Sequence, residues 1–336
     1  MAEFITLGIE SSCDETAAAV VADGVKIKSN IISSQLDLHR CFGGVVPELA
    51  ARSHLETILP IYRLALEEAG IDSLDQVDLI AATYGPGLVG SLLVGLSFAK
   101  GLALAGNKPF IGVNHIEGHI YANVLERPPI QTPALCLTVS GGHTDLLYVE
   151  QWGEYKILGR TRDDAAGEAF DKVARVLGLG YPGGPEIDKR AKGVTGYLEF
   201  AKLKGLSGTY DFSFSGLKTA VINYLHHQKQ MGLEIDVVQT AASFQQTAVA
   251  QLTDKLFKAA REYQVRSILL SGGVAANSHL REQCRAEADK LGISVFYPEL
   301  KLCTDNAAMI AAAGYFRHHA GGITGLEITA QPDLRL

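Results

Sequence analysis

Residues 4–21 read FITLGIESSCDETAAAVV, and this stretch decides the fold. The apolar run Phe4 to Ile9 predicts a strand, Glu10 to Thr16 predicts a polar turn, and Ala17 to Val21 predicts a second strand. A strand, a polar turn and a strand in this order predict a β-hairpin that presents its tip to a ligand.

The same order returns in residues 135–149, which read LCLTVSGGHTDLLYV, so the two halves look like distant copies of one plan. Between them, residues 126–133 read ERPPIQTP and form the best linker in the chain. We therefore expect an N-terminal lobe over 1–132 and a C-terminal lobe over 133–336. The last helix, about 305–320, is expected to pack back toward the N-terminal lobe.

Strand and helix patterns alternate within both halves. Helical spacing covers residues 49–69, near 88–105 and 307–319, and apolar strands are expected at 77–83, 110–113, 267–270 and 294–297. Such alternation implies an α/β fold with a mainly parallel sheet covered by helices.

Composition sets limits on the compartment and the partners. With 336 residues, two domains are the default, and a net charge of −7 argues against wrapping nucleic acid over the whole surface. The five cysteines contain no CxxC pair, which favours a reducing compartment. The first residues lack the pattern of a signal peptide, and the apolar stretch 87–106 is short and glycine-rich for a membrane span. We expect a cytoplasmic protein without a membrane anchor.

Residues 115–119 read HIEGH and place His115 and His119 on one face of a helix. That spacing suits two ligands of one first-row metal, although paired helix histidines bonded to backbone or water are the alternative. Glu117 lies about 200° around the helix from His115 at about 100° per residue, so the general-base role of a zinc-protease glutamate is not supported. Asp305 could supply a third ligand, or it could cap the helix that follows. Two histidines and a carboxylate suit non-haem iron, and zinc also accepts this set.

Glycine pairs close two of the expected strands, at Ser140-Gly-Gly and at Ser271-Gly-Gly. Such turns let backbone N–H groups approach phosphate or carbonyl oxygens, although tight structural turns are the alternative. Residues 85–90 match GxGxxG, but the acidic residue of a dinucleotide site is missing about 20 positions on. A P-loop is excluded because no glycine-lysine-serine or glycine-lysine-threonine combination is present.

Further polar candidates lie near the turns. Asp14 and Glu15 at the first hairpin tip could serve as a general base or orient a ligand, or they could be a solvated turn. Asp171, Gly184 and Asp188 lie near glycine turns, where helix caps are the alternative. Residues 189–204 carry five Lys/Arg and one glutamate, and they form one of the few basic segments available for RNA.

Nine motifs, in order along nearly the whole chain, resemble those of one family, the bacterial tRNA N6-adenosine threonylcarbamoyltransferases (TsaD). They are SSCDET (11–16), GGVVPE (43–48), HIEGH (115–119), VSGGHT (139–144), AFDK (169–172), YPGGP (181–185), FSFSGLK (212–218), GGVAAN (272–277) and CTDN (303–306).

The resemblance implies the two-lobed fold of actin, heat-shock ATPases and sugar kinases, with a mixed sheet in each lobe and a central nucleotide cleft. It implies transfer of threonylcarbamoyl from threonylcarbamoyl-AMP to N6 of the adenine beside the anticodon, in tRNAs reading codons that begin with A. His115, His119 and Asp305 would hold a divalent metal, usually Fe²⁺, and Asp14 would be the acidic residue at the reacting end, with Glu15 beside it. The adenylate contacts implied are Thr138, Val139, Ser140, Gly141, Gly142, Asp171, Gly184, Asp188 and Asn277.

The implied partners are tRNA, a shorter paralogous subunit that dimerises with this protein, and a P-loop ATPase. Three other readings stay open at this point: a metal-dependent glycoprotease, a kinase or ATPase of the same superfamily, and a non-catalytic scaffold in a modification complex.

Overall fold

The computed structural model describes residues 2–336 except 128, 201–205, 207 and 323, and the chain forms two compact units. The first unit comprises Met1–Ile130 together with Pro298–Leu336, and the second comprises Gln131–Tyr297. The expected C-terminal lobe ran from 133 to 336. In the structure, residues 298–336 are part of the first unit because their helix packs on its sheet.

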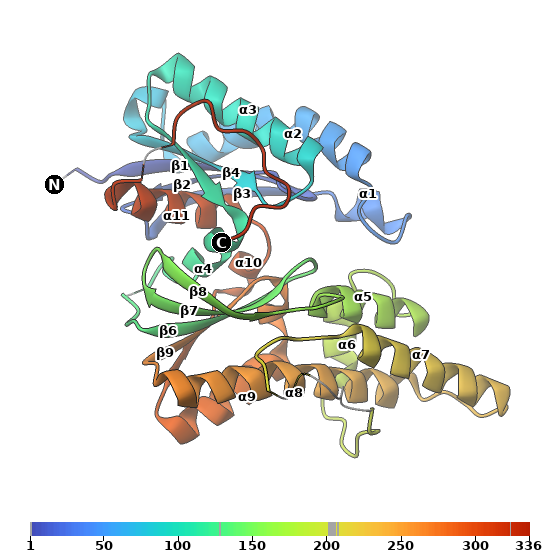
Figure 1. Cartoon of the computed structure of the whole chain (residues 1–336). Helices are drawn as coiled ribbons and strands as arrows, with labels where there is room; N and C mark the ends of the chain where they lie inside the picture. Colours follow the sequence, from blue (N-terminus) through green and yellow to red (C-terminus); the bar gives the residue numbers. More distant parts are fainter. Residues whose placement is uncertain (1, 128, 201–205, 207, 323) are drawn as a thin grey trace. The chain divides into compact units, whose positions relative to one another are not determined.

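The first unit is built on a five-stranded mixed sheet in the order β3-β2-β1-β4-β5 (Figure 1). β1 pairs antiparallel with β2, closing the expected hairpin, and β4 and β5 run parallel to β1. Half of the pairings are antiparallel, so the mainly parallel sheet inferred from the alternation was wrong and the mixed sheet implied by the resemblance is confirmed. The strands are β1 (Ile5–Glu10), β2 (Glu15–Ala22), β3 (Lys26–Ser34), β4 (Leu79–Gly85) and β5 (Phe110–Asn114).

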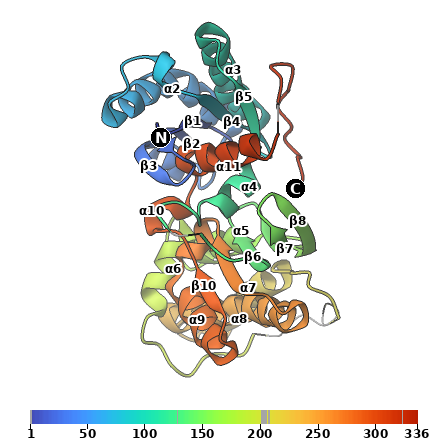
Figure 2. The same ribbon diagram turned by 90° about the vertical axis from the view of Figure 1, so that its left-hand side faces the viewer.

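Helices cover both faces of this sheet (Figures 1 and 2). α2 and α3 pack together over β2 and β4, while α11 packs across β1, β2 and β4 and contacts α4. The helices of the unit are α1 (Leu36–Arg40), α2 (Pro47–Ala69), η1 (Leu74–Gln76), α3 (Val89–Gly106), α4 (His115–Tyr121), α10 (Leu300–Cys303) and α11 (Ala307–His319).

Close approach of α11 to the sheet depends on a glycine in β1. A Cβ at Gly8 would lie 2.2 Å from the carbonyl oxygen of Ala307 and 2.8 Å from the backbone nitrogen of Ala311. Only glycine leaves room for the helix backbone at this distance. The C-terminal tail also returns to this unit, where Gln331 donates its N–H to the carbonyl of Tyr84 at 2.7 Å.

α3 is the one helix among the described residues that is long and apolar enough to cross a membrane, with a mean hydropathy of 1.6 over 18 residues. Core helices of globular proteins pass the same test. Its buried face, which includes Leu92, Leu96 and Ala99, packs against α2 and β4.

The second unit repeats the plan of the first, with a mixed sheet in the order β10-β9-β6-β7-β8. β6, β7 and β8 form an antiparallel meander, and β9 and β10 run parallel to β6, so each strand matches its counterpart in the first sheet. This confirms the expected duplication. The strands are β6 (Ala134–Val139), β7 (Thr144–Gln151), β8 (Glu154–Arg160), β9 (Ser267–Ser271) and β10 (Ser294–Phe296).

Among the described residues of the second unit, six helical segments accompany the sheet. α8 packs on β6 and against α6 and α9, and α5 packs against α6 and α7. They are α5 (Ala166–Val176), α6 (Gly183–Ala191), α7 (Ser215–Gln230), α8 (Val237–Tyr263), the 3-10 helix η2 (Gly273–Ala276) and α9 (Ser278–Leu291).

Candidate functional site

The two histidines lie at the point where β5 ends and α4 begins. Asn114 caps α4, because its side-chain oxygen accepts the N–H groups of Ile116 at 2.8 Å and Glu117 at 3.3 Å. The cap starts the helix immediately after the strand, so His115 and His119 share one helix face with ring centroids 4.7 Å apart.

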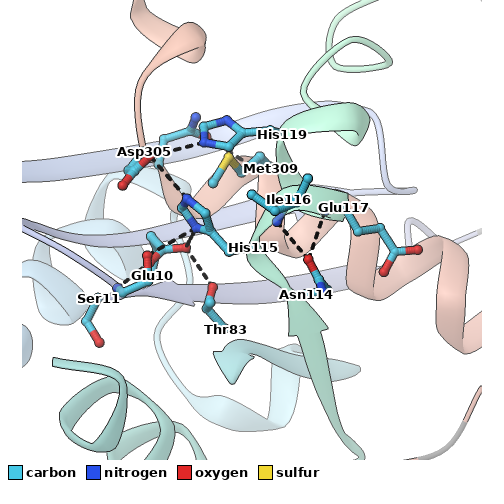
Figure 3. A network of polar contacts seen from close by, with 12 residues as sticks. Glu10, Ser11, Thr83, Asn114, His115, Ile116, Glu117, His119, Asp305 and Met309 are labelled. Atoms are coloured by element: carbon cyan, nitrogen blue, oxygen red, sulfur yellow. Dashed lines mark hydrogen bonds and ion pairs between the residues drawn. The ribbon is translucent and has the colours of Figure 1, made fainter. Parts of the chain in front are cut away.

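Asp305 faces both histidines from the connection between α10 and α11 (Figure 3). Its Oδ1 lies 3.4 Å from Nε2 of His115 and 3.2 Å from Nε2 of His119. The neighbouring Asn306 caps α11 by accepting the N–H of Met309 at 3.0 Å. The capping alternative for Asp305 is therefore wrong, since the residue after it performs that role.

The donor set fits a divalent metal. One ligand atom from each of His115, His119 and Asp305 lies within 4.8 Å of the others. Two atoms about 2.05 Å from one ion at a tetrahedral angle are about 3.3 Å apart, which is close to the measured separations. His119 is 1% exposed, its Nε2 faces the carboxylate of Asp305, and its Nδ1 has no hydrogen-bond partner in the described part of the chain. A buried imidazole without a partner is costly unless something else binds it.

The charged groups of this site shift one another's pKa values. Burial lowers the pKa of His115, but the carboxylates of Asp305 and Glu10 outweigh burial and raise this pKa well above its usual value. Burial raises the pKa of Asp305, but His115 and His119 outweigh it and hold this pKa below its usual range. The site therefore favours cationic character between its two carboxylates.

Two buried residues of this network escaped the sequence reasoning. Glu10, fully buried, accepts a hydrogen bond from the hydroxyl of Thr83 at 2.6 Å and lies 3.0 Å from Nδ1 of His115. Glu10, Thr83 and His115 lie at or next to the carboxyl ends of β1, β4 and β5, which are neighbouring parallel strands. Glu10 and Thr83 could have been found from the sequence as polar residues at the ends of neighbouring parallel strands.

Glu117 takes no part in this network. Its carboxylate pairs with Arg317 of α11 at 3.0 Å, and Figure 3 shows it pointing away from the two histidines. A zinc-protease glutamate must reach water on the metal, and Glu117 is engaged elsewhere.

The turn with Asp14 and Glu15 belongs to the same unit, and a buried histidine holds it. Nε2 of His54 lies 3.0 Å from the carbonyl oxygen of Cys13 and donates to it, while Nδ1 lies 2.7 Å from the hydroxyl of Thr16. Burial lowers the pKa of His54 and so favours the neutral imidazole. Burial also raises the pKa of Glu15 well above its usual value, and the charges of Asp305 and Asp14 raise it further.

In the second unit, the two glycine-pair turns lie against one another at the ends of β6 and β9. A Cβ at Gly272, whose φ is +82°, would lie 2.5 Å from the carbonyl oxygen of Val139. A Cβ at Gly167, in the first turn of α5, would lie 2.6 Å from the carbonyl oxygen of Ser140. Backbone packing this close requires glycine at both positions.

The remaining expected adenylate contacts surround these turns and already make internal hydrogen bonds. Asp171 accepts the N–H of Gly183 at 2.7 Å, and Asp188 accepts the N–H and hydroxyl of Ser278 at 3.2 and 2.9 Å. Asn277 caps α9 by accepting the N–H of Leu280 at 2.9 Å. These side chains therefore order the first turns of α6 and α9.

Several of the expected contacts face open space. At Gly141, Gly142 and Gly184 an added Cβ would meet no atom within 4 Å, so the Cα side of each glycine faces open space. Thr138 differs, because it is fully buried and its hydroxyl lies 2.8 Å from that of Ser271. Open glycine backbone beside the first turns of helices is typical of sites that bind phosphate.

The basic segment 189–204 is only partly described. Lys189 and Arg190 lie on α6, where Arg190 pairs with Glu186, and Lys192 follows the helix. Lys202 and Lys204 lie outside the described residues.

Sequence comparison identifies relatives over nearly the whole chain. A family model described as TsaD, tRNA N6-adenosine threonylcarbamoyltransferase, matches residues 26–312. A Clostridium perfringens protein named tRNA N6-adenosine threonylcarbamoyltransferase is 54% identical over 333 residues, covering 99% of this chain and 98% of its own. A protein of the same name from Moorella thermoacetica is 55% identical over 331 residues, covering 98% and 96%.

Two solved structures of low sequence identity resemble this chain in fold. T. kodakarensis HypF has a TM-score of 0.63 at 14% identity, covering 94% of this chain and 48% of its own. A ROK family glucokinase from Streptomyces griseus has a TM-score of 0.50 at 12% identity, covering 94% and 99%. The two-lobed fold of actin-like ATPases and sugar kinases is confirmed. With these matches over nearly its full length, the chain belongs to the TsaD family of tRNA N6-adenosine threonylcarbamoyltransferases.

Proposed function

We propose that this protein transfers the threonylcarbamoyl group from threonylcarbamoyl-AMP to N6 of the adenine beside the anticodon, in tRNAs reading codons that begin with A. The new N–C bond forms at the carbamate carbonyl, the bond from that carbon to the phosphate oxygen of AMP breaks, and the N6 amine loses a proton. AMP is a good leaving group, so the reaction requires no side-chain nucleophile.

The observation that carries the proposal is the triad of His115, His119 and Asp305 beside an acidic turn, in a chain of this family. These residues would hold a divalent metal, Fe²⁺ by family resemblance, although Zn²⁺ accepts the same ligands. When bound, the ion would supply Lewis acidity toward the carbamate carbonyl.

Residues of the hairpin turn would handle the proton. Glu15 has a raised pKa, which suits a group that takes a proton near neutral pH. Asp14 would orient the amine or accept the proton, and His54 holds both residues in place through the carbonyl of Cys13.

The glycine turns of the second unit would bind the adenylate. Thr138, Val139, Ser140, Gly141 and Gly142 form the end of β6 and its turn, and backbone N–H groups there can donate to phosphate oxygens. Asp171, Gly184, Asp188 and Asn277 would contact the adenosine or order the helix starts that do so.

Partners follow from the same assignment. We infer tRNA as the acceptor, a shorter paralogous subunit and a P-loop ATPase, acting in the cytoplasm. Support for a subunit contact is the set of exposed apolar side chains on the packed helices α2 and α3: Leu55, Leu59, Val89, Leu93 and Leu104. Apolar side chains gathered on neighbouring helices are typical of a subunit interface.

Replacement in cells tests the proposal. Bacteria depleted of their own enzyme would be given this chain, and nucleosides from their tRNA would be measured by mass spectrometry. Restored threonylcarbamoyladenosine with wild-type protein, but not with Asp305→Asn, is expected. Equal restoration by both would favour a scaffold role, and ATP hydrolysis or peptide cleavage without tRNA modification would favour the rival enzymes.

A further inference from the structure

We propose that Glu10 is a positioning residue that fixes the tautomer of His115, so that Nε2 of this histidine is the atom presented to the metal. The inference rests on the metal site proposed above and deepens it. It concerns a carboxylate outside the proposed set of metal ligands and outside the pair Asp14 and Glu15.

Glu10 and Asp305 lie on opposite sides of the His115 ring (Figure 3). Oε2 of Glu10 is 3.0 Å from Nδ1, and Oδ1 of Asp305 is 3.4 Å from Nε2. A carboxylate can only accept, and both ring nitrogens of His115 face one. With a metal held by Nε2 and Asp305, the remaining proton of His115 would belong on Nδ1, where Glu10 accepts it. The lone pair is then on Nε2, facing Asp305 and His119.

Glu10 is itself held in place by donors. The hydroxyl of Thr83 donates to Oε2 at 2.6 Å, and the N–H of Ser12 donates to Oε1. Burying a carboxylate costs free energy unless hydrogen-bond donors satisfy it. These donors therefore stabilise the fully buried Glu10 and fix its orientation. Its three donors come from the turn after β1, from β4 and from α4.

The hydroxyl of Ser12 also lies 3.1 Å from Nδ1 of His115. A hydroxyl can donate or accept, so it is compatible with either tautomer. The charged acceptor of Glu10 therefore decides which nitrogen carries the proton.

His119 has no acceptor at Nδ1, among the described residues, that corresponds to Glu10. Its Nδ1 has no hydrogen-bond partner among the described residues, although the ring is buried. Metal-bound histidines usually donate their second N–H to a carboxylate, carbonyl or water. The two histidines are thus unequal, and His115 is the ligand whose orientation is set before the metal arrives.

The matched control is Glu117, a second buried carboxylate that lies on the metal-binding helix itself. Its partner is Arg317, and it faces away from the site. Glu10→Gln and Glu117→Gln make the same chemical change at similar burial; the first alters a contact to the ligand His115, and the second alters the pair with Arg317.

Zn²⁺ titration of the metal-free full-length protein, by calorimetry, measures the effect. Glu10→Gln should weaken Zn²⁺ binding about 10- to 100-fold, while Glu117→Gln stays within about threefold of wild type. Thr83→Val, which removes a donor to Glu10, should fall between them. Equal affinities for Glu10→Gln and Glu117→Gln would overturn the inference.

A second measurement does not depend on whether Glu10→Gln folds. Two-bond ¹H–¹⁵N spectra of the Zn²⁺-loaded wild-type protein report which nitrogen of each histidine carries the proton. His115 should carry its proton on Nδ1 with Nε2 bound to zinc, and the opposite assignment would refute the proposal. Loss of zinc binding in His119→Ala separately tests the metal site. A failure of the metal site can therefore be distinguished from a failure of the role proposed for Glu10.

Discussion

Oδ1 of Asp305 lies 3.2 Å from Nε2 of His119, although His119 lies on α4 and Asp305 lies far along the chain, in the connection between α10 and α11. Asn306 makes this arrangement available, because it caps α11 and frees Asp305 from that role. Removing the Asp305 charge should therefore abolish the metal site without unfolding the helix.

The first prediction concerns that charge. Asp305→Asn should weaken Zn²⁺ binding at least about 10-fold, since a carboxylate ligand is replaced by a neutral amide. Zn²⁺ at 100 times its Kd stabilises a wild-type site by about 2.7 kcal/mol, so the variant should lose most of the zinc-dependent rise in Tm. Asp37→Asn, at an acid whose side chain is 90% exposed, is the control and should keep the whole rise. An unchanged rise in Asp305→Asn would contradict the site.

A second prediction concerns pH. The pKa of His115 is raised in the folded metal-free protein, so its stabilising contribution is complete below the unfolded value of about 6.5 and is lost as pH rises through the raised pKa. Metal-free wild type should therefore lose stability toward alkaline pH more steeply than His115→Gln. Zinc competes with that proton, so its stabilising effect should grow with pH. Denaturant unfolding at pH 6 and pH 9, with and without zinc, measures both effects. If the free energy of unfolding changed equally with pH in wild type and His115→Gln, the prediction would be contradicted.

The third prediction separates stability from function at Glu15. Burial raises the pKa of Glu15, so the ionised form destabilises the folded state once pH exceeds the ordinary carboxyl range. Glu15→Gln should be more stable than wild type at pH 8, with the difference vanishing near pH 4, yet it should lower the rate of threonylcarbamoyl transfer. If Glu15 accepts the proton, the acid limb of the pH–rate profile disappears in the variant. A variant with full activity and an unchanged profile would remove Glu15 from the mechanism.

Much of the fold could be predicted from sequence because the signals were local. The hairpin over β1 and β2, the helix α2 and the repeat of the plan in β6 and β7 follow from apolar periodicity and polar turns. The antiparallel third strands, β3 and β8, were missed because their half-buried side chains lack a continuous apolar run. The return of α11 to the first unit was foreseen as a direction of packing, but the glycine contact at Gly8 that permits it depends on tertiary structure.

The site was predictable to a similar degree. The spacing of His115 and His119 indicated a metal, and Asp305 stood out as a polar residue between two elements. Glu10 and Thr83 were missed because they act through contacts between strands, which spacing along the chain does not reveal. The roles of Asp171 and Asp188 in ordering helix starts also became visible only with their partners.

A fourth prediction tests the packing of α11. Gly8→Ala forces a Cβ to within 2.2 Å of the Ala307 carbonyl oxygen, so β1 and α11 must separate. Overpacking of this kind costs about 1–3 kcal/mol or more, and Zn²⁺ affinity should also fall because Asp305 moves with the start of α11. Gly101→Ala, where nothing lies within 4 Å on an exposed face of α3, should stabilise by about 0.5–1 kcal/mol. Similar Tm values for the two variants would contradict this account of the packing.

A fifth prediction concerns the turns of the second unit. Gly142→Val adds a side chain into open space, so it should leave Tm nearly unchanged while weakening AMP binding about 10-fold or more through loss of backbone approach. Gly167→Ala should lower Tm, because its Cβ would lie 2.6 Å from the Ser140 carbonyl oxygen. Isothermal titration with AMP and thermal unfolding distinguish the two effects, and undiminished AMP binding in Gly142→Val would place the adenylate elsewhere.

The transfer reaction itself is the most direct test of the central claim. Purified protein, with its paralogous subunit and ATPase, would receive threonylcarbamoyl-AMP labelled in the threonine and an unmodified tRNA reading a codon that begins with A. We expect label on N6 of the adenine beside the anticodon with wild type, and label near background with Asp305→Asn. Unmodified tRNA in the complete wild-type mixture, or equal labelling by both proteins, would contradict the assignment.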